Sequence, residues 1–98
     1  MKEELNIIPE RMEKDFRILE TFTDPDELWS RRAFSKEYSE ARIWLAKEFE
    51  AAGLHVYNDA ASNLIGRRDG SANQILMLGS HIDTVKAGGR FDGIVGVL

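Results

Sequence analysis

The chain has 98 residues, 43% of them hydrophobic, and a formal net charge of −4 at pH 7. This composition is that of one ordinary globular domain with a modest core, and the negative charge argues against a nucleic-acid partner, because such proteins carry a positive excess that replaces phosphate counterions. The chain has no cysteine. Disulfides and thiolate metal sites are therefore excluded, and a metal here must be held by histidine nitrogen and carboxylate oxygen.

The sequence also argues against a membrane protein. No uninterrupted apolar stretch approaches the ~20 residues that span a bilayer, and the opening segment MKEELNIIPERMEK lacks the apolar centre of a secretory signal. We therefore expect a cytoplasmic protein without a membrane partner. Four of the eight arginines occur as two pairs, Arg31-Arg32 and Arg67-Arg68, rather than as a stripe, and we interpret them as solvated surface charge.

Two helices are predicted in the first half of the chain. The first covers about residues 9–22, since proline is tolerated in the first turn and an apolar stripe with helical spacing follows; its members are Met12, Phe16, Leu19 and Phe22. Residues 23–34 are assigned to a loop or a short helical turn. The second helix covers about residues 36–52, with Ser35 as N-cap and Gly53 as the left-handed stop. Its expected buried face consists of Tyr38, Ala41, Leu45, Phe49 and Ala52.

After Gly53 the pattern changes from helical to extended. Residues 55–57 and 63–67 are predicted strands, and 69–73 a turn. Residues 75–78, Ile-Leu-Met-Leu, are apolar without alternation, which predicts a strand covered on both faces, as in a parallel sheet. The fold class is therefore α/β, and the glycine-rich tail is expected at the carboxyl end of a central strand, where open α/β folds bind ligands.

The glycine-rich tail carries the residues with metal chemistry. His81, Asp83 and Asp92 lie within it; imidazole and carboxylate are normal ligands of zinc or manganese, and a second carboxylate beside a metal-bound histidine commonly accepts its other N–H. Gly88 and Gly89 allow a tight return. We therefore predict that His81 and Asp92 converge closely enough for one metal to contact both.

The spacing alone leaves a structural interpretation open, in which these side chains only make hydrogen bonds. Ser80, His81 and Asp83 are a poor catalytic triad, because neighbours on an extended chain point in alternating directions. A phosphate loop is also disfavoured, since neither phosphate-binding glycine motif is present. Trp29 and Trp44 are interpreted as packing residues.

Segments 79–85, 88–93 and 96–98 together resemble the hydantoinase/carbamoylase family of amidases, which are dinuclear metallohydrolases. Shorter matches upstream extend the resemblance over most of the chain: residues 32–35, Gly53-Leu54, Asp59, Asn63-Leu64 and Gly66-Arg67. Ser62 stands where the family usually has glycine, which puts a local turn in doubt. Related metallo-exopeptidases and deacylases also use a His-x-Asp after a strand, usually with a longer insertion before the next metal aspartate, so the compact GGRFDG linker favours the carbamoylase branch.

The resemblance implies roles for three residues. His81 would ligate one metal, Asp92 would bridge two, and Asp83 would belong to the catalytic machinery as the carboxylate that orients His81. The metals would be two divalent ions, zinc or manganese, with cobalt or nickel possible. Two such ions share and activate a water that attacks an amide or ureido carbon. The implied substrates are small molecules such as N-carbamoyl-L-amino acids or allantoate, and the sequence does not choose between them.

The resemblance also implies that residues 1–98 are the N-terminal portion of a longer zinc-exopeptidase-like catalytic domain, with two helices followed by strands of a mixed sheet. The general-base glutamate and the remaining ligands would lie further along a homodimeric parent protein. We therefore expect the chain alone to be inactive and its 75–78 strand to lack partners. The alternative is a non-catalytic binding module that retains part of the fold.

Overall fold

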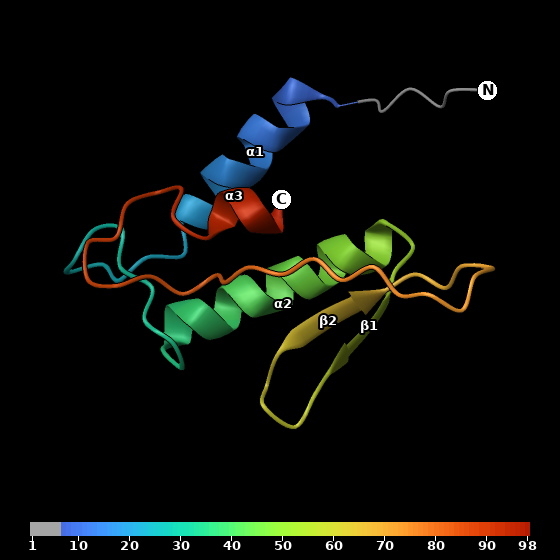
Figure 1. The fold of residues 1–98 in the computed structure, drawn as a ribbon. Helices are drawn as coiled ribbons and strands as arrows, with labels where there is room; N and C mark the ends of the chain where they lie inside the picture. Colours follow the sequence, from blue (N-terminus) through green and yellow to red (C-terminus); the bar gives the residue numbers. More distant parts are fainter. Residues whose placement is uncertain (1–6) are drawn as a thin grey trace.

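The computed structural model of the chain describes residues 7–98, so the first part of the MKEELNIIPERMEK segment lies outside the described range. Three helices and one β-hairpin form in the order α1 (Pro9–Glu20), α2 (Lys36–Ala51), β1 (His55–Asn58), β2 (Leu64–Arg67) and α3 (Ile94–Val97) (Figure 1). The predicted order of two helices followed by strands is confirmed. None of the described helices is long and apolar enough to cross a membrane.

Helix α2 begins and ends where its sequence signals predict. The Ser35 hydroxyl accepts a hydrogen bond from the backbone N–H of Tyr38 at 3.2 Å, which satisfies one of the donors left open at a helix start. Gly53 takes a left-handed φ of 85° just past the last turn, a conformation that glycine adopts without strain. The N-cap and the glycine stop are therefore both confirmed.

Helix α1 ends at Glu20, two residues before the predicted end. The backbone N–H of Thr21 donates to the Ile18 carbonyl at 3.1 Å, and the Thr21 hydroxyl donates to the same oxygen at 2.6 Å. These i to i−3 bonds tighten the last turn and end the helix.

Strands β1 and β2 pair antiparallel, with His55 opposite Arg67 and Asn58 opposite Leu64. The Asp59 carboxylate closes the connecting loop by accepting hydrogen bonds from the backbone N–H groups of Ala61 and Asn63, both at 2.9 Å. Ser62 has a φ of 66° in this loop. That left-handed value explains why a glycine would suit the position, and the turn forms with serine nonetheless.

A small apolar core joins segments that are distant in sequence. Its buried members come from α1, α2, α3 and the segment before Asp83, and they are Leu19, Ala41, Leu45, Ile82 and Ile94. Most residues of the two predicted apolar helix faces lie in or against this cluster, and Trp44 packs against it as expected. Ala52, predicted to be buried, is exposed because it follows the last residue of α2. Because Ile82 directly follows His81, core packing fixes the backbone on which the predicted site is built.

The predicted buried strand at residues 75–78 is wrong for this structure. These four residues do not form a strand, and their exposed fractions range from 73% for Ile75 to 87% for Leu76. The sheet within residues 7–98 has only the two hairpin strands. A strand forms only when its backbone N–H and C=O groups find partners on a neighbour, and none of the hydrogen bonds found in the described range involves residues 75–78.

Candidate metal centre

The His81 ring is held by a hydrogen bond at one nitrogen and directed at a carboxylate with the other. Its Nδ1 lies 2.9 Å from the backbone carbonyl oxygen of Asp83. Because a carbonyl can only accept, Nδ1 of the neutral ring carries the proton and Nε2 carries the lone pair. This tautomer leaves Nε2 as the atom that can bind a metal.

Asp92 provides the facing carboxylate. Its Oδ2 lies 3.9 Å from Nε2 of His81, so the predicted convergence of the two side chains is confirmed. With a neutral imidazole both facing atoms are electron-pair donors, and only a proton or a cation between them makes the contact favourable. Zinc bonds to nitrogen and oxygen are each about 2.0–2.2 Å long, so one ion can touch both atoms.

Asp83 faces the other side of the ring with two oxygens. Its carboxylate Oδ1 lies 3.3 Å from Nδ1 of His81, farther than its own backbone carbonyl at 2.9 Å. The sequence pointed to the carboxylate as the group that orients the ring. In the structure the shorter contact belongs to the main chain, and the carboxylate role of Asp83 stays a prediction.

Close backbone packing brings the Asp92 loop against His81. Gly93 has a φ of 75°, and a Cβ built on it would lie 2.2 Å from the His81 carbonyl oxygen and 2.7 Å from the ring. The Ser80 hydroxyl donates to the Gly93 carbonyl at 2.7 Å. Ser80 therefore joins the two halves of the site through the main chain, a role that the sequence did not indicate.

Arg31 is buried beneath the site, which corrects the prediction of solvated surface charge for this residue. It is 5% exposed, and its guanidinium donates to three carbonyl oxygens: Ile82 at 2.7 Å, Leu19 at 2.9 Å and Phe22 at 3.0 Å. Burial lowers the pKa of Arg31, and the charge of Asp83 opposes that shift. The other three paired arginines are exposed as predicted.

A second arginine fastens the loop that carries Asp92. The Arg90 guanidinium lies 5.6 Å from the centre of the Trp29 ring and 5.1 Å from that of Phe91, and it pairs with the Glu20 carboxylate at 3.4 Å. Trp29 is therefore a packing partner of a cation rather than a core residue, with 41% of its surface exposed. These contacts attach the loop to the end of α1.

The donor set at this site is partial. Within residues 7–98, no group of three or more histidine, cysteine, aspartate or glutamate side chains could hold a metal ion. His81 and Asp92 supply two donors of the kind that zinc or manganese takes, and their geometry fits such an ion. A stable zinc site takes four ligands, so further donors are needed besides these two.

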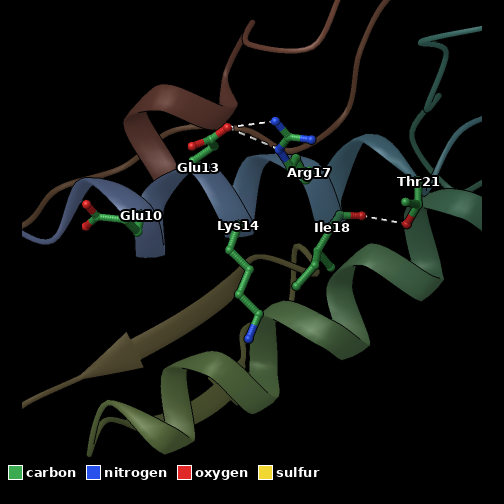
Figure 2. A pocket seen from close by; sticks show the side chains of 6 residues that line it. All are labelled: Glu10, Glu13, Lys14, Arg17, Ile18 and Thr21. Atoms are coloured by element: carbon green, nitrogen blue, oxygen red, sulfur yellow. Dashed lines mark hydrogen bonds and ion pairs between the residues drawn. The ribbon is translucent and has the colours of Figure 1, made fainter.

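A shallow depression on α1 lies outside the site and has a different character. Its lining comes from one helix and the residue after it: Glu10, Glu13, Lys14, Arg17, Ile18 and Thr21. Figure 2 shows these side chains along α1, with Arg17 paired to Glu13 at 2.7 Å. None of the predicted site residues contributes to this surface.

Comparison with known proteins finds relatives among amidohydrolases. The chain is 47% identical over 70 residues to an N-carbamoyl-L-amino-acid amidohydrolase of Pseudomonas sp. (strain NS671), covering 69% of this chain and 17% of that protein. It is 40% identical over 91 residues to the Paenarthrobacter aurescens enzyme of the same name, covering 91% of this chain and 22% of that protein. An allantoate amidohydrolase of Escherichia coli (strain K12) is 38% identical over 77 residues, covering 76% of this chain and 19% of that protein.

The solved structures agree. A hydantoinase/carbamoylase family amidase from Burkholderia ambifaria superposes with a TM-score of 0.84 and 33% identity over 96% of this chain and 24% of that one. No family model matches. The chain is thus similar in sequence and fold to one part of these proteins. It is similar to the corresponding part of hydantoinase/carbamoylase family amidases, and it spans about a fifth of the length of the curated relatives it matches.

Proposed function

We propose that the protein to which this chain corresponds is a metal-dependent hydrolase of non-peptide C–N bonds in small amide or ureido compounds, such as N-carbamoyl-L-amino acids or allantoate. The observation that carries this proposal is the 3.9 Å approach of His81 Nε2 to Asp92 Oδ2. The relatives, N-carbamoyl-L-amino-acid and allantoate amidohydrolases by name, support this substrate class over a peptide substrate.

In this proposal the chain contributes part of a centre for two divalent metal ions, zinc or manganese. His81 would bind one ion through Nε2, and Asp92 would use its two oxygens to bridge both. When bound, two such ions lower the pKa of a shared water and stabilise the oxyanion formed on the substrate. The Asp83 carbonyl favours the tautomer of the neutral ring that carries the proton on Nδ1, and this tautomer leaves Nε2 as the ligand atom.

The proposal assigns further parts of the centre to residues outside the 98 of this chain. With two donors, the isolated chain should bind zinc weakly and should not hydrolyse N-carbamoyl amino acids or allantoate. We further propose that the complete protein is cytoplasmic and homodimeric. Calorimetric titration and a turnover assay on the purified chain test the ligand count. Submicromolar zinc binding together with turnover would contradict it.

A chimera tests the activity directly. The matching part of the Paenarthrobacter aurescens enzyme, which is 40% identical over 91 residues, is replaced by this chain, and hydrolysis of N-carbamoyl-L-amino acids is measured. We expect turnover in the chimera and its loss in His81→Ala and Asp92→Ala. The loss should exceed the ~10–100-fold that follows removal of an outer-sphere partner.

His55→Ala is the matched control, because His55 is the chain's other histidine and lies exposed on β1. It should leave turnover unchanged. A chimera that stays fully active with His81→Ala would refute the proposal. A chimera that is folded but inactive with both histidines in place would refute it as well.

A further inference from the structure

We propose that Arg31 is a positioning residue of the candidate metal centre. Its buried guanidinium fixes the peptide unit between Ile82 and Asp83, and thereby the ring orientation that directs Nε2 of His81 at Asp92. This inference rests on the proposed function for its consequence in catalysis. The positioning itself is a property of the metal-free chain and can be tested without a metal.

The first step is the peptide unit between Ile82 and Asp83. The Arg31 Nε donates to the Ile82 carbonyl at 2.7 Å, while Nη1 of the same guanidinium donates to the carbonyls of Leu19, in the last turn of α1, and of Phe22, just after it. A peptide unit is planar, so holding its carbonyl orients the whole unit. One rigid side chain therefore connects the end of α1 to the centre of the His-x-Asp segment.

The second step is the next peptide unit, between Asp83 and Thr84. The Thr84 N–H donates to the Arg31 backbone carbonyl at 2.7 Å, and the Thr84 hydroxyl accepts from the Arg31 N–H at 2.8 Å. In a trans peptide the carbonyl points opposite to the N–H. The Asp83 carbonyl is therefore directed away from Arg31, and it is this oxygen that meets Nδ1 of His81 at 2.9 Å.

Arginine suits this task better than lysine. The guanidinium is planar, carries five N–H donors in a fixed fork and is weakly hydrated, so it can reach several carbonyls at once when buried. A lysine ammonium is a compact, strongly hydrated point charge on a flexible stem. Arg31→Lys should therefore keep only part of the guanidinium's contacts. Arg31→Met, which keeps the apolar stem and the main-chain bonds to Thr84, should lose all three guanidinium bonds that anchor this segment to α1.

The experiment reads the tautomer of His81 by ¹⁵N NMR of the imidazole nitrogens in the metal-free chain, at a pH where the ring is neutral. The chain has only two histidines, and the exposed His55 is an internal reference. Losing the preference that one hydrogen bond gives to a tautomer changes the ratio of the two tautomers by a factor of about five. We expect the ratio of Nδ1–H to Nε2–H forms of His81 to fall about fivefold in Arg31→Met, with Arg31→Lys between that value and wild type.

Arg32→Met is the matched control, since Arg32 is the exposed neighbour, and it should leave the ratio unchanged. A folded Arg31→Met chain with the wild-type ratio overturns the proposal. If Arg31→Met does not fold, hydrogen exchange of the wild-type Arg31 Nε–H decides: slow exchange with a nuclear Overhauser contact to Ile82 supports the proposal, and exchange as fast as that of Arg32 overturns it.

A zinc titration of the same samples separates this inference from the proposed function. If both hold, zinc shifts the His81 signals in the wild-type chain and its affinity falls about tenfold in Arg31→Met, the lower end of the range for outer-sphere partners. If zinc does not affect His81 while the tautomer ratio still depends on Arg31, the metal function fails and the positioning role stands.

Discussion

Replacing Gly93 by alanine should damage both the stability and the site geometry of the chain. A side chain at a φ of 75° is disfavoured by about 1–2 kcal/mol. The added Cβ would also lie 2.2 Å from the His81 carbonyl oxygen and 2.7 Å from its ring, and overpacking of this kind costs about 1–3 kcal/mol. The sum is about 2–5 kcal/mol, which lowers Tm by at least ~8 °C in a domain of this size.

Thermal unfolding followed by circular dichroism measures this loss. Gly89→Ala is the matched control, because Gly89 has a φ of 89° in the same loop and no atom within 4 Å of a built Cβ; it should lose only the 1–2 kcal/mol of the backbone conformation. NMR signals of the His81 ring should move in Gly93→Ala and not in Gly89→Ala. Equal stability losses in the two variants would refute the close contact between Gly93 and His81.

Three further predictions concern the hairpin loop and the exposed segment. The side-chain hydrogen bond from Asn63 holds the pKa of Asp59 below its ordinary value of 3.8. The stabilisation of the fold by the ionised Asp59 is therefore fully present above that value and is lost as the pH falls through the lower folded pKa. Asn63→Ala should raise the pKa of the Asp59 carboxyl measured by NMR, and an unchanged titration midpoint would contradict this. Ser62→Gly should raise the stability by up to about 1 kcal/mol, since Ser62 has a left-handed φ of 66°, and a lowered Tm would argue against that turn. Leu76→Lys should reduce self-association measured by light scattering, because a charge interrupts an exposed apolar run. It should change the free energy of unfolding by no more than about 0.5 kcal/mol, and a large destabilisation would show that Leu76 is buried.

Features set by neighbours in sequence were predictable. The Ser35 cap and the Gly53 stop follow from interactions within a few residues, and both form. The two predicted strands form as well, as β1 and β2, and their antiparallel pairing is a finding of the structure. The approach of His81 to Asp92 also follows from the short glycine-containing return between them. In these cases the interacting groups are so close along the chain that few backbone conformations compete.

Other features depend on contacts between distant residues, and only the tertiary structure decided them. Nothing local distinguishes Arg31 from Arg32, yet Arg31 bonds to Ile82 across 51 positions of sequence and is buried, while Arg32 is exposed. The apolar pattern of residues 75–78 predicts a strand, but a strand needs hydrogen-bonding neighbours that the pattern does not supply. The sequence by itself thus indicated His81 and Asp92 as the candidate metal ligands, and the tertiary contacts determined what holds them in place, because burial and long-range hydrogen bonds are properties of the assembled fold.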